Sequence, residues 1–156
     1  MSKIRVGVAG YGTIGQRLAD GVAQQEDMEL VGIADLAPTL SLRALRERDM
    51  IGVNGVKYNL YLVDGADEEA FKAADIPVAG SFADLCQNVD IMLDSAPGGV
   101  GAKNKENYYE KYGVKAIFQG GEKNAVADVF FHGYANYEKG VGKDYLKLTS
   151  CNTTGL

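Results

Sequence analysis

The sequence predicts a doubly wound α/β domain built around a mainly parallel β-sheet. Apolar, β-branched runs alternate with segments of helical spacing from the start of the chain. Parallel strands joined by right-handed helical crossovers require this order. Glycine-rich turns follow several of the runs. The chain has 156 residues, 46% of them hydrophobic, so it is long enough to bury a core.

The first two strand–helix units are expected in the first third of the chain. Residues 4–9 form a β-branched run that ends in a glycine. Residues 13–25 have helical spacing, because apolar side chains recur four apart. Residues 28–34 form a second apolar strand, which Asp35 closes. Residues 38–49 then form a polar helix rich in arginine.

The middle of the chain continues this alternation. We expect a third strand at 57–63, a short helix at 67–74 and a short extended piece at 77–79. Ser81 is suited to be the N-cap of the next helix. Residues 89–94 form a strand that leads into a turn of one proline and two glycines.

The last third begins with the same pattern and then becomes less regular. Residues 102–112 are expected to be helical, and 114–118 to form a strand that ends in a glutamine and two glycines. The following residues carry a weaker pattern and end in an expected strand at 145–149. We find no internal repeat and no linker, so the expected elements form one domain.

Four strand ends carry residues that suit ligand binding: Gly10–Gly15, Asp35, Ser95–Gly99 and Gln119–Gly121. In doubly wound sheets, ligands bind beyond the carboxyl ends of the strands. We therefore expect these four loops to converge on one edge of the sheet and to form the site there.

The first of these loops fits the pattern GxGxxG through Gly10, Gly12 and Gly15. The first glycine can make a tight turn, the second lets the backbone approach a pyrophosphate, and the third lets the helix pack closely on the strand. The helix N-terminus would attract the pyrophosphate through its free N–H groups and its dipole. Because the pattern follows a strand and opens a helix, it predicts a Rossmann-like dinucleotide site over an ordinary tight turn.

Asp35 follows Gly15 by 20 residues, at the end of the second expected strand. A carboxylate there can accept hydrogen bonds from the adenosine ribose hydroxyls, and it repels a 2′-phosphate. The first arginine after it is Arg43. These residues favour NAD over NADP; an N-cap or a solvated loop acid is the alternative interpretation of Asp35.

Cys151 lies between Ser150 and Asn152, where a helix could begin. A thiol at a helix N-terminus or beside a cation has a pKa below its usual value of about 8.5 and can act as a nucleophile. Ser150 and Asn152 could contact an oxyanion or a phosphate, and Thr153 a phosphate. A lone cysteine is otherwise a small core residue, so the spacing leaves both interpretations open.

A thiolate can attack an aldehyde to give a hemithioacetal, whose hydride can pass to a nicotinamide. Inorganic phosphate can then attack the resulting thioester and give an acyl phosphate. Cys86 lies in an apolar helix, and His132 lies beside two phenylalanines. Both are more simply explained as structural residues than as catalytic ones.

Composition limits the partners of the chain. The net charge is −5, with acidic and basic residues interspersed, which argues against nucleic acid and against a polybasic membrane surface. No apolar run approaches the roughly 18–20 residues that span a bilayer, and the N-terminus lacks signal-peptide features. The two cysteines do not form a disulfide framework. A cytoplasmic protein with reduced thiols is therefore expected.

Together the motifs resemble the N-terminal part of an archaeal-type (type II) glyceraldehyde-3-phosphate dehydrogenase. In chain order they are GYGTIGQRLAD at Gly10–Asp20, PGGVGAKN at Pro97–Asn104, AIFQGGEK at Ala116–Lys123, NYE at Asn136–Glu138, GKDY at Gly142–Tyr145 and SCNTTGL at Ser150–Leu156. The resemblance covers nearly the whole chain and is far more specific than GxGxxG alone. It implies oxidation of glyceraldehyde 3-phosphate, with inorganic phosphate and NAD or NADP, to 1,3-bisphosphoglycerate.

By the same resemblance, Cys151 matches the catalytic nucleophile, and Ser150 and Asn152 match its substrate-contacting neighbours. The resemblance also matches Thr13, Ile14 and Gly121 to cofactor contacts. With the glycine pattern and the other strand-end loops, the residues expected to contact the cofactor are Gly10, Gly12, Thr13, Ile14, Gly15, Asp35, Pro97, Gly120 and Gly121. Where the family often has Lys-Thr-Arg-Pro, this chain has Asp35-Leu36-Ala37-Pro38, which again favours NAD. The chain also departs from the family pattern at Asn124 and at His132, so His132 inherits no role.

The resemblance implies a dinucleotide-binding domain at 1–149 and the start of a catalytic domain at 150–156, the rest of that second domain being absent from this chain. The family's catalytic histidine, phosphate-binding arginine and most of its homotetramer interface would lie downstream. We therefore expect this chain to bind NAD but to turn over poorly alone, with the missing domain or its own copies as partners. Two alternatives are a stand-alone NAD-binding or sensing module, able to pair with a separately encoded catalytic chain, and another semialdehyde dehydrogenase.

Overall fold

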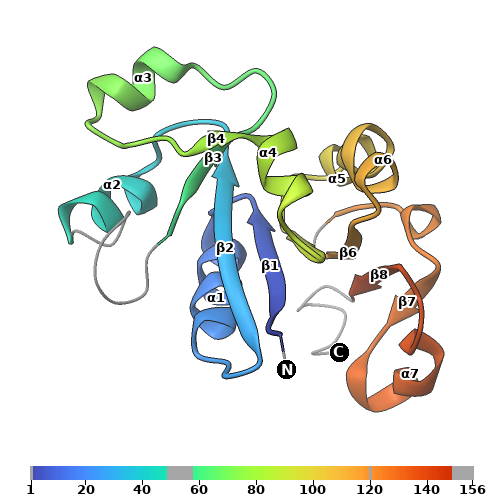
Figure 1. The fold of residues 1–156 in the computed structure, drawn as a ribbon. Helices are drawn as coiled ribbons and strands as arrows, with labels where there is room; N and C mark the ends of the chain where they lie inside the picture. Colours follow the sequence, from blue (N-terminus) through green and yellow to red (C-terminus); the bar gives the residue numbers. More distant parts are fainter. Residues whose placement is uncertain (1, 49–57, 120, 149–156) are drawn as a thin grey trace.

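The computed structural model describes residues 2–48, 58–119 and 121–148 of the chain. Within these ranges eight strands form one sheet in the order β4-β3-β2-β1-β5-β6-β8-β7 (Figure 1). Every neighbouring pair of these strands is parallel. The predicted doubly wound α/β fold is confirmed, and the described sheet is wholly parallel.

The elements have the following bounds. The strands are β1 (Ile4–Ala9), β2 (Met28–Asp35), β3 (Leu60–Leu62), β4 (Gly80–Ser81), β5 (Ile91–Asp94), β6 (Lys115–Phe118), β7 (Val129–Phe131) and β8 (Tyr145–Leu148). The α-helices are α1 (Thr13–Ala23), α2 (Leu40–Glu47), α3 (Glu68–Ala73), α4 (Phe82–Gln87), α5 (Val100–Asn104), α6 (Glu110–Tyr112) and α7 (Gly133–Gly140). A π-helical segment, η1 (Lys105–Tyr109), joins α5 to α6, and a 3₁₀ turn, η2 (Asn124–Val126), precedes β7.

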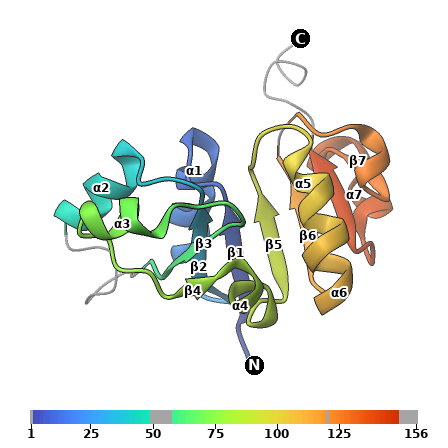
Figure 2. The same cartoon turned by 90° about the horizontal axis from the view of Figure 1, so that it is seen from above.

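Helices lie on both faces of the sheet (Figure 2), and buried side chains form two apolar cores beneath them. On one face, α1, α2 and α3 pack on β1, β2 and β3 around buried side chains such as Ile33 and Phe71. On the other face, α4 and the continuous segment α5–η1–α6 pack around Phe82, Tyr109 and Phe118. A fully buried apolar side chain of this size contributes roughly 1.5–3 kcal/mol, so both helical layers hold the sheet in place.

Most expected elements are present, with their ends shifted by a few residues. The extended piece expected at 77–79 is corrected slightly, because the paired strand β4 begins at Gly80. Ser81 is the N-cap of α4, as predicted: its hydroxyl accepts a hydrogen bond from the Asp84 N–H, and its own N–H donates to the Asp84 carboxylate. The expected ends at residues 49, 57 and 149 lie outside the described residues.

The segment after β6 contains more regular structure than its sequence pattern indicates. It includes η2, the short strand β7 and the helix α7. Strand β7 is only three residues long, and α7 contains one residue in a non-helical conformation, Asn136, with φ of −150°. Neither element is long or regular enough to give a clear periodic signal.

The strand order changes direction between β1 and β5. Strands β2, β3 and β4 follow on one side of β1, and the later strands follow on the other side of β5. At this point Ala9, at the end of β1, lies in register with Ala34 of β2 and with Asp94 of β5. Doubly wound sheets bind ligands at such a switch point, and three of the predicted loops begin there.

Candidate functional site

The glycine-rich turn joins β1 to α1 in a tight conformation. Gly10 has a φ of 83°, in the left-handed region that favours glycine. A Cβ atom at Gly15 would lie 1.8 Å from the carbonyl oxygen of Gly10, whereas a Cβ at Gly12 would have no atom within 4 Å. Packing therefore requires a glycine at position 15, while the space beside Gly12 is open to a ligand.

Helix α1 begins without a side-chain cap. Its N-cap is Gly12, and its first turn contains no acidic residue. The N–H groups of the first turn and the positive end of the helix dipole favour an anion, with a typical stabilisation of about 0.3–1 kcal/mol at an exposed site. Thr13 and Ile14 are exposed at this end. The predicted position of the pyrophosphate is thus accessible.

Asp35, at the end of β2, contacts the same turn. Its Oδ2 accepts a hydrogen bond from the N–H of Tyr11 at 2.9 Å, and its Oδ1 accepts one from the N–H of Leu36 at 2.7 Å. The residue is half-buried, and each carboxylate oxygen can accept a further hydrogen bond. Asp35 therefore holds the turn against β2 and can still accept hydrogen bonds from ligand hydroxyls.

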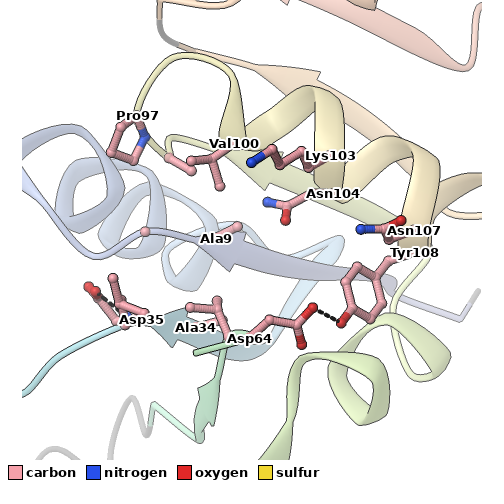
Figure 3. Close-up of a pocket in the computed structure, with 14 residues that line it drawn as sticks. Ala9, Ala34, Asp35, Asp64, Pro97, Val100, Lys103, Asn104, Asn107 and Tyr108 are labelled. Carbon is pink, nitrogen blue, oxygen red and sulfur yellow. Dashed lines mark hydrogen bonds between the residues drawn. The ribbon is translucent and has the colours of Figure 1, made fainter. Parts of the chain in front are cut away.

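A cavity of about 380 Å³ extends along the switch point, between the ends of three strands and the segment α5–η1 (Figure 3). Its apolar lining consists of Ala9, Ala34, Leu36, Val63, Ala96, Pro97 and Val100. Its polar side chains are those of Asp35, Asp64, Lys103, Asn104, Asn107 and Tyr108. Apolar walls with a few convergent polar groups are typical of small-molecule and cofactor sites.

Asp94, at the end of β5, is buried beside this cavity, with an exposed fraction of 2%. Its Oδ2 accepts hydrogen bonds from the Tyr109 hydroxyl at 2.6 Å and from the Asn104 side-chain amide at 2.9 Å. Its Oδ1 accepts one from the N–H of Ala96 at 3.0 Å. These three donors satisfy the carboxylate, as burial of a charged group requires. Asp94 thus fixes the loop that carries Pro97.

Two successive tyrosines of η1 connect this segment to two strand ends. Tyr109 donates to Asp94 at the end of β5, and Tyr108 donates to Asp64, just after β3. Burial, followed by the hydrogen bond to Asp64, raises the pKa of Tyr108 to about 12, so its hydroxyl remains a donor at neutral pH. π-helical turns are frequently found at functional sites, and this one forms part of the cavity wall.

The structure brings most of the predicted cofactor residues together. Gly10, Asp35 and Pro97 line the cavity, and Gly12, Thr13, Ile14 and Gly15 form the adjoining turn and helix start. Gly121 lies apart from this cavity, where a Cβ at Gly98 would lie 2.9 Å from its carbonyl oxygen, and it lines a second hollow of about 630 Å³. Gly120 lies outside the described residues, as do the predicted nucleophile Cys151 and the predicted substrate contacts Ser150, Asn152 and Thr153.

Four polar residues that α5 and η1 bring to the cavity were not predicted as site residues from the sequence: Lys103, Asn104, Asn107 and Tyr108. Their spacing of three and four residues places them on one helix face together with Val100, and this spacing is a readable signal. Asp64 was also missed. It directly follows the strand expected at 57–63, as Asp35 follows the strand expected at 28–34, so the argument made from strand ends could have found it.

Two residues considered in the sequence analysis have structural roles. Cys86 is 1% exposed, and burial, with the nearby Asp94, raises its pKa to about 12; its predicted place in the core is confirmed. His132 is the N-cap of α7, where its Nδ1 accepts a hydrogen bond from the Tyr134 N–H at 3.3 Å.

In residues 2–48, 58–119 and 121–148, no group of three or more His, Cys, Asp or Glu side chains is arranged to hold a metal ion. None of the helices in these ranges is both long enough and apolar enough to cross a bilayer.

Comparison with curated proteins gives close matches over the whole chain. The chain is 51% identical to the glyceraldehyde-3-phosphate dehydrogenase of Thermococcus kodakarensis over 99% of its length. It is 46% identical to that of Archaeoglobus fulgidus over 100% of its length, and 49% identical to that of Pyrococcus furiosus over 99%. The chain spans only 43% of the length of each of these relatives.

The other comparisons add little. No protein-family model matches the chain. Among solved structures, the NDP-N-acetyl-D-galactosaminuronic acid dehydrogenase of Methanosarcina mazei Go1 aligns with a TM-score of 0.48 and 17% identity, over 93% of this chain and 34% of that one. This likeness is too weak to support an argument. The curated relatives confirm the resemblance that the motifs indicated: from end to end, this chain is similar to the N-terminal part of the archaeal-type glyceraldehyde-3-phosphate dehydrogenases.

Proposed function

We propose that this chain supplies the cofactor-binding half of a phosphorylating glyceraldehyde-3-phosphate dehydrogenase, and that its cofactor is NAD. One observation carries the proposal. The cavity at the switch point starts at the glycine-rich turn, passes Asp35 and continues between apolar walls. The name shared by the relatives indicates an oxidoreductase, and a dehydrogenase of this kind uses a nicotinamide cofactor.

The described residues fit a dinucleotide. The open space beside Gly12 and the uncapped start of α1 suit a pyrophosphate. Asp35 suits the adenosine ribose, and its negative charge opposes the 2′-phosphate of NADP. Thr13, Ile14 and Pro97 would contact the cofactor near the turn, and Gly120 and Gly121 are proposed as further cofactor contacts. When bound, the nicotinamide would supply the acceptor for a hydride.

For the chemical step, we propose Cys151 as the nucleophile, with Ser150, Asn152 and Thr153 as substrate contacts. The thiolate would attack the aldehyde carbon of glyceraldehyde 3-phosphate to form a hemithioacetal, and loss of a hydride would leave a thioester. Inorganic phosphate would then displace the thiolate and give 1,3-bisphosphoglycerate.

The remaining machinery is proposed to lie in the rest of the full-length protein. We propose a boundary between residues 149 and 150, a homotetrameric full-length enzyme and a cytoplasmic location. A positioned base contributes roughly 10²–10⁴-fold to such a reaction. This chain alone is therefore expected to bind NAD and to turn over weakly.

Calorimetric titration of this chain with NAD and, separately, with NADP tests the cofactor role. We expect saturable NAD binding, weaker NADP binding, and a loss of NAD affinity in Asp35→Ala. Glu106→Gln is a matched control, because it removes a charge from an exposed position outside the cavity lining. Absence of binding to either dinucleotide would contradict the cofactor role, and tighter NADP binding would contradict the preference.

NADH formation from glyceraldehyde 3-phosphate and phosphate tests the chemical role in the full-length protein. We expect Cys151→Ser to abolish activity and Cys86→Ser, in the buried position, to retain the reaction. Activity that survives Cys151→Ser would exclude this nucleophile. Robust NADH formation by the 156-residue chain alone would show that the missing machinery is not required.

A further inference from the structure

The far end of the cavity holds a second strand-end carboxylate, to which the proposed cofactor assignment gives no role. Asp64 lines the same cavity as Asp35. Figure 3 shows Asp35 toward one end of the cavity and Asp64, with Tyr108, toward the other. The two acids are thus separated along the cavity, with the apolar Ala34 between them.

The carboxylates of Asp35 and Asp64 accept different sets of hydrogen bonds from the protein. Both oxygens of Asp35 accept backbone N–H groups. Asp64 accepts a hydrogen bond through Oδ2 from the Tyr108 hydroxyl, and no other described residue donates to it. Its Oδ1 is therefore available, and an ionised carboxylate can only accept hydrogen bonds. The far end of the cavity consequently presents a fixed acceptor.

The order of the groups along the cavity indicates how a bound dinucleotide would be oriented. If the pyrophosphate lies at the start of α1 and the ribose at Asp35, the base extends toward Asp64. Val63 and Val100, which line the cavity, suit the flat faces of a purine. The edge of the base then meets the polar groups at the far end. Adenine presents an exocyclic amino group at that edge, which is a donor, whereas hypoxanthine presents a carbonyl oxygen, which is an acceptor.

We propose that Asp64, oriented by Tyr108, selects adenine over purines that lack the exocyclic amino group by accepting a hydrogen bond from that amino group. This inference rests on the proposed dinucleotide function and adds base selectivity to it. Tyr108 is a positioning residue, because it acts by holding the carboxylate. Lys103 lines the same cavity, and its ammonium group can only donate hydrogen bonds. It would therefore favour hypoxanthine, so Asp64 and Lys103 predict opposite base preferences.

The test is a calorimetric titration of this chain with NAD and with nicotinamide hypoxanthine dinucleotide, in which a carbonyl oxygen replaces the exocyclic amino group and the neighbouring N1 carries a hydrogen. We expect NAD to bind roughly 10-fold more tightly, because a mismatched polar group loses a charge-assisted hydrogen bond. In Asp64→Asn the side-chain amide can donate or accept, so the ratio of the two dissociation constants should fall to about 1. Tyr108→Phe should lower the ratio partly, since the carboxylate remains but is no longer held.

Two variants serve as controls. Asp35→Ala should weaken both dinucleotides equally and leave the ratio unchanged, because Asp35 is placed at the ribose. Glu106→Gln should change neither affinity. Equal binding of the two dinucleotides by the unchanged chain, or an unchanged ratio in Asp64→Asn, would overturn the inference.

The remaining outcomes are also decisive. A preference for the hypoxanthine dinucleotide would overturn the inference and assign the base edge to Lys103. Absence of binding to either dinucleotide would overturn the proposed cofactor function and, with it, this inference. Binding without selectivity would overturn the inference alone, so the two failures are distinguishable.

Discussion

The ends of β2 and β5 carry two aspartates at nearly the same level of the sheet, yet the fold uses them differently. Asp94 is 2% exposed and accepts hydrogen bonds from two side chains and one backbone group. Asp35 is half-buried and accepts only from two backbone groups. The segment α5–η1 covers the end of β5 and supplies the two side-chain donors for Asp94. The neighbours of a strand-end acid therefore decide whether it stabilises the fold or remains available to a ligand.

The glycine-rich turn shows the same division. Gly15 is required by packing, because a Cβ there would meet the Gly10 carbonyl oxygen. Gly12 faces open space. Asp94 and Gly15 are thus part of the framework, whereas Asp35 and Gly12 are available to a ligand.

The largest expected effect is on the framework acid. Asp94→Ala would leave the Tyr109 hydroxyl and the Asn104 amide buried without their acceptor, and should lower the free energy of unfolding by about 3–5 kcal/mol. Asp35→Ala should lower it by about 1 kcal/mol, since the backbone groups it frees can reach water. Urea denaturation measures both. Equal losses of stability in the two variants would contradict the conclusion that Asp94 stabilises the fold more than Asp35 does.

The glycine pair should separate stability from binding. Gly15→Ala forces a methyl group against backbone and should cost about 1–3 kcal/mol of stability. Gly12→Ala should leave stability nearly unchanged but weaken NAD binding roughly 10-fold, because its Cβ enters the space proposed for the pyrophosphate. Denaturation and calorimetry on the same samples give both quantities. A Gly12→Ala variant as unstable as Gly15→Ala would show that position 12 also serves packing.

The charge of Asp35 can be separated from its hydrogen bonds. Asp35→Asn keeps an acceptor but removes the negative charge, so NAD affinity should fall by only about 3-fold while NADP affinity rises. Titration with each dinucleotide at two salt concentrations measures the effect, and the NADP response should be larger at low salt. An unchanged ratio of NAD to NADP affinity would show that charge at this position does not set the preference.

A pH dependence of stability is expected from the core beside Asp94. Burial raises the pKa of Cys86 from about 9 to about 12 in the folded chain. Between these values the unfolded chain loses a proton that the folded chain keeps, so stability is full below pH 9 and falls as the pH rises. The loss at pH 10 should be about 1 kcal/mol. Denaturation at pH 8 and pH 10 should show a smaller drop in Cys86→Ala; identical drops would assign the effect to other groups.

The sequence predicted those features of the candidate site and the fold that depend on residues adjacent in the chain. The glycine turn, the acid at the end of β2 and the Ser81 cap each depend on a few adjacent residues, and the structure has them where they were expected. The weakly patterned segment after β6 was less predictable. There β7 is held by pairing with β8, a contact that its own three residues do not signal.

Local chemistry in the sequence determined the alternation of strands and helices, the tight turn at Gly10 and the acid at position 35. Hydrophobic spacing and the conformational freedom of glycine act within one or two turns of chain, so they can be read without a fold. Only the tertiary structure decided that Asp94 is buried and Asp35 accessible, and that Tyr108 meets Asp64 across 44 positions of chain. These outcomes depend on which helix packs over which strand end, and such packing joins residues that share no local pattern.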